Sequence, residues 1–329
     1  MRRWRPWLVS LVITGGLFWY LLSQIDPAEL LETARSMTLR YLVIFATLLL
    51  MGALARAIRF WLLLDRGPPL HLLSAIVLAR NLFVDLLPAR LGELSYVYLL
   101  TRRAQRPAED GLASLFLAVL FDVVALAPLL ILAVLVVGGD GTISVPVLSA
   151  AAIGLGLLAF AIMRVAVPVG GWVASRIGTD DTTGWRFTLA QLTQKTVSAL
   201  RDVQRRRIFG QVLLVSMVVR LCKFGSYYFL VLAIMGPLGY TVGGLGFFRV
   251  FLGVVSAELA AALPIHGIAG FGTYEAVWAF SFTQLGFSTE HAIMTGILTH
   301  AVSQVVEYSL GVVALFYVMR PGKGERTSE

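Results

Sequence analysis

Long apolar runs, each ended by a short charged or Gly/Pro-containing break, constrain this chain more than any other feature. Runs such as residues 41–64 and 111–137 exceed the roughly 20 residues that a helix needs to cross the hydrocarbon core of a bilayer. Lipid offers no hydrogen-bond partners, so such a run folds as a helix. With 58% hydrophobic and 14% charged residues, the chain departs from soluble domains, which average about 45–50% and about 25%. We therefore expect residues 1–329 to form one all-α, polytopic helical membrane domain.

The positions of the basic residues give the orientation. The formal net charge of +8 could indicate a nucleic-acid partner, but Lys and Arg cluster at the ends of apolar runs, at residues 2–5, 102–106, 205–207 and 320–326. Such clusters mark the cytoplasmic side of a membrane protein. We therefore expect no nucleic-acid partner, a multi-pass protein of the cell membrane, and N- and C-termini in the cytoplasm.

Charge and hydropathy together predict six spans. The first has the basic and apolar parts of a signal peptide, but no small-residue cleavage site follows it before Asp26, so we favour an uncleaved span. The polar segment 168–207 has apolar residues at helical spacing and is expected to be an amphipathic connector on the cytoplasmic leaflet. The six spans are placed at residues 7–22, 41–64, 111–137, 146–167, 208–235 and 292–319.

Two further apolar segments, residues 70–100 and 243–285, each contain a Leu-Pro break and several ionisable residues. Both flanks of the first segment are basic, so it is expected to enter and leave on the cytoplasmic side. Neither flank of the second segment is basic, so it is expected to enter and leave on the outer side. We predict two re-entrant broken-helix hairpins, which lipid tolerates only where they line a cavity or are buried in protein. For the first, the alternative is one full span plus an interfacial helix.

The two halves of the chain show the same order of features. Each has a span with two basic residues three apart, a broken segment with a basic residue and a Glu, and a span with one acid. The predicted orientations are opposite, so residues 7–137 and 146–319 are expected to be inverted-topology repeats, as in alternating-access transporters. The equivalences are Arg56 and Arg59 with Arg220 and Lys223, Arg90 with His266, Glu93 with Glu275, and Asp122 with Glu307.

Ionisable residues inside apolar runs give the candidate site. Each costs about 2.5–3.5 kcal/mol to insert, so it needs a partner or a water-filled cavity. Paired cations on one helix face suit a phosphate, to which Arg donates in a bidentate fork. Acids facing such cations are candidates for carrying a coupling proton, namely Asp122, Glu307 and Asp85. The substrate-binding candidates are Arg56, Arg59, Arg90, Glu93, Arg220, Lys223, His266 and Glu275.

Ion pairing inside the protein, or snorkelling to the interface, is the alternative role for these charges, and the favoured one for Arg80, Arg249 and Glu258. His300 has no motif support. The single cysteine, Cys222, excludes an intrachain disulfide and a CxxC metal site, and we expect no metal and no cofactor.

The chain resembles the family named for the lysylphosphatidylglycerol synthase transmembrane region, also called flippase-like. The similarity covers nearly the whole chain, and two motifs carry it. They are Leu263-Pro264 with a Gly-rich turn to Glu275, and residues 81–93, which end in Leu87-Pro88-Ala89-Arg90-Leu91-Gly92-Glu93. The resemblance implies a membrane unit that moves a modified lipid, and in bifunctional members this unit precedes a soluble aminoacyl-transferring domain. We expect the membrane unit alone here. Where the family usually has Pro-Gly-Gly-Leu-Gly, this chain has His266-Gly267-Ile268-Ala269-Gly270.

The leading hypothesis is a lipid flippase and not an enzyme. It would translocate a phospholipid, glycolipid or polyprenyl-phosphate lipid with an anionic headgroup across a bacterial or archaeal cytoplasmic membrane by alternating access. One alternative is a membrane-embedded glycosyl or aminoacyl transferase, which would use an acidic pair such as Asp180-Asp181 in the polar segment. Another is a small-solute transporter with a cavity sealed from lipid. The partners consistent with a flippase are the lipid itself, further copies of the chain and a separate lipid-synthesising enzyme.

Overall fold

The described part of the chain is entirely helical. The computed structural model describes residues 23–86, 92–138, 205–261 and 272–320, with isolated positions between 16 and 21 and between 150 and 203. Every regular element in these residues is an α-helix, which confirms the all-α prediction. In chain order they are α2 (Pro27–Ser36), α3 (Leu39–Leu63), α4 (Leu70–Leu86), α5 (Glu93–Ala104), α6 (Ala108–Gly138), α9 (Phe209–Met235), α10 (Val242–Leu245), α11 (Phe247–Ala261), α12 (Thr273–Gln284) and α13 (Thr289–Met319).

Four of these helices, α3, α6, α9 and α13, are long and apolar enough to cross a membrane. Each begins and ends within three residues of a predicted span, so hydropathy located these four correctly. The other two predicted spans, 7–22 and 146–167, and the connector 168–207 lie outside the described residues apart from isolated positions.

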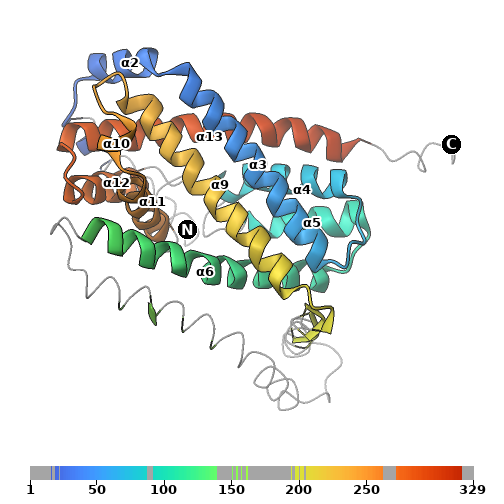
Figure 1. The fold of residues 1–329 in the computed structure, drawn as a ribbon. Coiled ribbons are helices and arrows are strands. Elements are labelled where there is room, and N and C mark those ends of the chain that lie inside the picture. Colours follow the sequence, from blue (N-terminus) through green and yellow to red (C-terminus); the bar gives the residue numbers. More distant parts are fainter. Residues whose placement is uncertain are drawn as a thin grey trace, which may run out of the picture.

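The helices α3 and α9 form an antiparallel pair through the middle of the protein (Figure 1). The N–H of Thr38, just before α3, donates to the carbonyl of Ala233 near the end of α9 at 3.0 Å. Gly52 allows the close approach, because a Cβ there would lie 3.3 Å from the Cβ of Cys222. This packing brings the polar faces of both helices together.

Two pairs of short helices, α4–α5 and α11–α12, lie on opposite sides of the α3–α9 pair (Figure 1). The segments that join the members of each pair, residues 87–91 and 262–271, are outside the described residues. Both pairs pack over glycines: a Cβ at Gly92 would lie 2.0 Å from a backbone carbonyl of α4, and one at Gly253 would lie 2.2 Å from the ring of Phe282. The positions of the predicted Leu-Pro breaks therefore coincide with the junctions of two tightly packed helix pairs.

Local side chains define several helix ends. Asp26 accepts a backbone hydrogen bond at 2.8 Å in the first turn of α2, and Ser288 does the same at 3.3 Å for α13. At the other end of α13 the guanidinium of Arg103, from α5, donates to the carbonyl of Met319 at 2.9 Å. The last carbonyls of a helix lack partners within the helix, so this contact ties α13 to α5.

Candidate functional site

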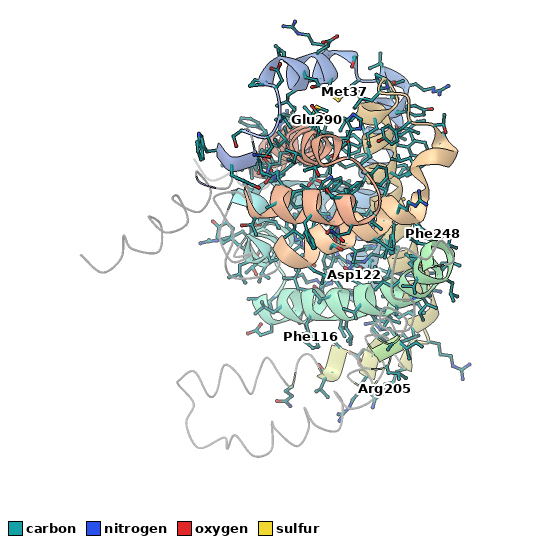
Figure 2. All side chains as sticks on the ribbon, turned by 90° about the vertical axis from the view of Figure 1, so that its left-hand side faces the viewer. Met37, Phe116, Asp122, Arg205, Phe248 and Glu290 are labelled. Carbon is teal, nitrogen blue, oxygen red and sulfur yellow. The ribbon has the colours of Figure 1, made fainter. Side chains whose placement is uncertain are left out.

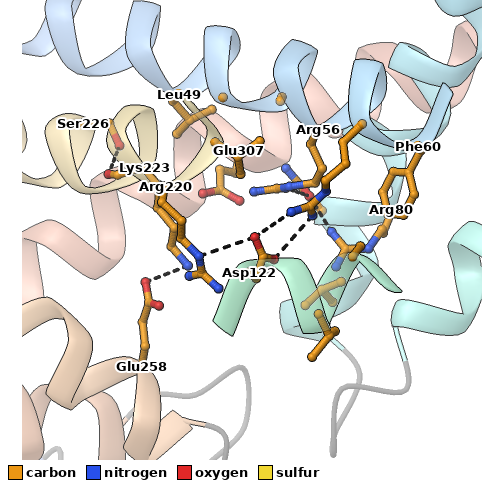
Figure 3. A pocket seen from close by; sticks show the side chains of 18 of the residues that line it. Leu49, Arg56, Phe60, Arg80, Asp122, Arg220, Lys223, Ser226, Glu258 and Glu307 are labelled. Atoms are coloured by element: carbon orange, nitrogen blue, oxygen red, sulfur yellow. Dashed lines mark hydrogen bonds and ion pairs between the residues drawn. The ribbon is translucent and has the colours of Figure 1, made fainter. Parts of the chain in front are cut away.

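A cavity of about 320 Å³ lies in the interior where α3, α4, α5, α6, α9, α11 and α13 meet (Figure 3). In Figure 2, Asp122 lies among the packed helices, whereas Phe116 of the same helix is on its outer face. Buried ionisable groups are rare in membrane helices, and here many come together in one place. The ionisable side chains that line the cavity are Arg56, Arg59, Arg80, Glu93, Asp122, Arg220, Lys223, Tyr227, Glu258 and Glu307.

Asp122 of α6 joins three helices. The guanidinium of Arg59, from α3, donates to its two carboxylate oxygens at 2.6 and 3.3 Å, and to the hydroxyl of Ser216 at 3.3 Å. Arg220 of α9 places its Nε 3.4 Å from the nearer of those carboxylate oxygens. A carboxylate between two guanidinium groups is held in its charged form, so Asp122 orients the two arginines.

Two more ion pairs flank this junction. Arg80 donates from Nε to Glu93 at 2.7 Å and also from a terminal nitrogen, which connects α4 to α5. Lys223 lies 2.6 Å from a carboxylate oxygen of Glu258, which connects α9 to α11. Internal ion pairing, expected from the sequence for Arg80 and Glu258, is therefore confirmed for both.

Arg56 is different, because its described hydrogen-bond partner is neutral. It donates to the side-chain oxygen of Asn81 at 3.1 Å, and the same oxygen accepts from Arg80 at 3.2 Å. Among the described residues, no carboxylate lies within ion-pair distance of Arg56. Glu307 of α13 projects between Arg56 and Arg220 in Figure 3.

The described lining carries an excess of positive charge. Five basic side chains face four carboxylates, which leaves one positive charge. Asp122 is shared by two arginines, so the excess is concentrated around Arg56, Arg59 and Arg220. Among the described residues, the buried Nε–H of Arg59 has no hydrogen-bond partner, and the buried Nε–H of Arg220 has only its longer ion-pair contact with Asp122. Buried donors without acceptors are costly, so this part of the cavity is suited to an anion that accepts hydrogen bonds.

The structure brings most of the candidate residues together. Seven of them line the cavity: Arg56, Arg59, Glu93, Arg220, Lys223, Asp122 and Glu307. Arg90 and His266 lie outside the described residues, as does the side chain of Asp85. Glu275 is not among the described lining residues; it is fully buried and pairs with His300 between α12 and α13.

Sequence analysis did not assign three polar residues to the site that the structure places there: Arg80, Asn81 and Glu258. Arg80 and Asn81 lie seven and six residues before Leu87 of the Leu-Pro motif, about two helical turns, so their closeness to the motif was the available signal. Glu258 lies five residues before Leu263 of the second Leu-Pro and could have been found in the same way.

Comparison with known proteins gives one match. No curated protein and no solved structure matches the chain significantly. The model of one protein family, described as the lysylphosphatidylglycerol synthase TM region, matches residues 7–311. This range covers α3, α6, α9, both helix pairs, α13 as far as residue 311, and every described residue that lines the cavity. The chain therefore belongs to the family of the lysylphosphatidylglycerol synthase transmembrane region.

Proposed function

We propose that this protein is a lipid flippase, which moves a lipid with an anionic headgroup across the cell membrane by alternating access. The headgroup occupies the cavity while the hydrocarbon chains stay in the bilayer. In this role the chain transports its lipid without modifying it, and a separate enzyme synthesises the lipid. Membership of a lipid-related membrane family supports this class of function.

The observation that carries the proposal is the local excess of cations around Arg56. A phosphate group would accept hydrogen bonds from Arg56 and from the two buried Nε–H groups of Arg59 and Arg220. It would also balance the single positive charge left in the described lining. A cationic ligand would do neither, and a neutral ligand could accept hydrogen bonds but would not balance the charge.

Access from the lipid side separates a flippase from a transporter of small solutes. Val119 of α6 lines the cavity and is also 62% exposed on the apolar outer surface of that helix. One side chain thus borders both the polar cavity and the surface that lipid would cover. This supports a lateral opening through which acyl or prenyl chains extend into the bilayer while the headgroup is inside.

The helix contacts support the predicted inverted repeats. The contact of α3 with α4 corresponds to that of α9 with α11, and the contact of α5 with α6 corresponds to that of α12 with α13. The contact of α4 with α13 likewise corresponds to that of α11 with α6. The helices α3 and α9 would be equivalent and they contact each other. The extensive contact of α6 with α9 has no equally extensive counterpart between α13 and α3. In this proposal the two helix pairs are the re-entrant hairpins, and six spans leave both termini in the cytoplasm.

The test is headgroup translocation in vesicles reconstituted with the purified protein. Vesicles contain a trace of phosphatidylglycerol with a fluorescent headgroup-proximal label, and an impermeant reductant measures how fast label reaches the outer leaflet. A charged hydrogen bond contributes about 1.5–3 kcal/mol, so R56Q is expected to slow translocation by roughly ten- to a hundredfold. The matched control is R40Q, because Arg40 begins the same helix but is exposed and faces Tyr41.

Two results would refute the proposal. One is a wild-type protein that moves neither phosphatidylglycerol nor another anionic lipid faster than empty vesicles do. The other is an R56Q protein that is folded and transports at the wild-type rate. Equal rates for phosphatidylglycerol and phosphatidylcholine in the wild type would refute the anionic preference.

A further inference from the structure

A second buried polar cluster lies between α12 and α13, and the cavity does not include it. The carboxylate of Glu275 has no exposed surface, and one of its oxygens lies 2.5 Å from Nδ1 of His300. The other oxygen accepts the N–H of Gly272 at 2.7 Å, at the start of α12. On the far side of the ring, Nε2 of His300 lies 2.6 Å from the side-chain nitrogen of Gln304.

These contacts fit one protonation state of the cluster, in which the tautomer of His300 is assigned from its neighbours. An amide nitrogen can only donate, so Nε2 of His300 accepts from Gln304 and carries no proton. The ring proton is then on Nδ1, where it is donated to Glu275. The histidine is neutral and the glutamate is ionised, which leaves one negative charge on the pair.

Protonation would change the direction of one hydrogen bond. A proton added to Nε2 of His300 turns the ring into an imidazolium that donates from both nitrogens. The side chain of Gln304 must then rotate, so that its oxygen accepts where its nitrogen had donated. The new imidazolium cancels the charge of Glu275. One proton is consumed, and the aqueous phase supplies it.

Helix geometry links this cluster to the cavity. Gln304 and Glu307 follow His300 at four and seven residues along α13, so all three lie on one face of the helix. Glu307 lines the cavity about 10 Å from His300, given a rise of about 1.5 Å per residue. The cluster also contacts the cavity wall through Tyr274, whose ring packs 4.7 Å from that of His300.

Other ionisable groups near the cluster come from three helices. Tyr274 of α12 faces Tyr227 of α9, and the charge of Glu258 in α11 also acts on it. Glu258 is held by Lys223, and both line the cavity. A change of charge on the Glu275–His300 pair is therefore felt by groups that belong to the headgroup site.

We propose that Glu275 and His300 form a proton-binding switch that controls the headgroup cavity through Gln304 and Glu307. This inference rests on the proposed function. Proton binding removes a negative charge about 10 Å from the cavity and reorients an amide one turn from Glu307. Both effects favour the binding of an anion, and their Coulomb part alone corresponds to an affinity change on the order of tenfold. Anionic lipid and proton are thereby bound together.

The first test needs no lipid substrate. The four histidines of the full-length protein are labelled with ¹⁵N, and their ring signals are followed by NMR from about pH 5 to 9. H300Q removes one signal and so assigns it. We expect the His300 ring to carry its proton on Nδ1 at high pH and to become an imidazolium as pH falls. A ring that does not titrate, or that carries its proton on Nε2, would overturn the proposal.

The second test is the pH dependence of phosphatidylglycerol translocation in reconstituted vesicles. Wild type is expected to transport roughly tenfold faster on the acidic side of the His300 midpoint than on its basic side. H300Q should lose this dependence, and E275Q, whose amide still accepts the bond from Gly272, should weaken it. The matched control is H291Q, since His291 lies at the start of α13 and contacts Tyr240. Wild-type pH dependence in folded H300Q would refute the switch, whereas a wild type that moves no anionic lipid would refute the proposed function.

Discussion

Replacing Asp122 by Asn tests whether one carboxylate holds α3, α6 and α9 together. The change keeps the size of the side chain and removes its charge. It leaves Arg59, whose side chain is only 2% exposed, without a counter-charge, and it removes the carboxylate nearest to Arg220. An asparagine can accept one hydrogen bond from Arg59 with its oxygen, but its NH₂ would face the second donor.

The magnitude follows from burial. Removing one partner of a fully buried ion pair costs about 3–5 kcal/mol, because the remaining charge is uncompensated. The side chain of Asp122 is 21% exposed toward the cavity, where water screens part of the charge. We therefore expect D122N to lower the free energy of unfolding by about 3 kcal/mol, the lower end of that range. R59M should be milder, since Asp122 keeps Arg220 nearby.

The assay is reversible denaturation of the purified protein in detergent micelles, with D122N, R59M and the double variant forming a thermodynamic cycle. The double variant should be less destabilised than the sum of the single variants by at least about 1 kcal/mol. Each change removes the charge that the other leaves without its partner in the Arg59–Asp122 pair. E109Q is the control, because Glu109 is a partly exposed acid in the first turn of the same helix. Additive effects, or a D122N protein as stable as E109Q, would refute this account of the ion pair.

Two more predictions concern packing and surface charge. G92A should destabilise the protein by about 3 kcal/mol in the same denaturation assay, because a Cβ would lie 2.0 Å from the backbone oxygen of Phe83. G210A, at a position with open space, should not destabilise it. At the protein surface, a hydrogen bond with Glu290 and repulsion by its charge raise the pKa of Glu29 above 4.5. Because the folded protein holds this proton more tightly than the unfolded chain does, protonated Glu29 stabilises the fold at low pH, and this stabilisation is lost as pH rises through the raised pKa. The melting temperature should therefore fall less between about pH 4.5 and 6.5 in E29Q than in wild type.

The sequence predicted the long helices well because lipid imposes a simple rule. A spanning helix needs a continuous apolar run, so α3, α6, α9 and α13 were located to within three residues. The short pairs were harder to describe. Pro88 and Pro264 indicated two breaks, but no sequence pattern gave the packing of α4 on α13 or of α11 on α6. Those contacts depend on where glycines allow two helices to approach closely. Gly311 of α13 is one example, because a Cβ there would lie 2.9 Å from the Cβ of Leu82 in α4.

For the candidate site too, one part could be predicted from the sequence and another could not. Charges in apolar runs must face the interior, and this predicted that Arg56, Arg59, Arg220 and Asp122 would be found together. Their pairing could not be predicted, because any of the acids could have matched any of the bases. His300 was left without a role, although its spacing from Glu307 on α13 was a usable signal. A single histidine at helical spacing carries little information until its partner, Glu275, is known to lie across the helix interface.

Glu93 and Glu275 show what the two motifs have in common and where they differ. Both lie in the first turn of the second helix of a pair, and both bind a basic side chain. Yet the side chain of Glu93 is 27% exposed to the cavity, whereas that of Glu275 is completely buried. Two inverted repeats that always had the same conformation would place these residues in equivalent surroundings. Alternating access requires them to differ, since the repeats exchange conformations between the two states. The asymmetry therefore fits the proposed alternating access, with Glu93 open to the cavity and Glu275 buried against His300.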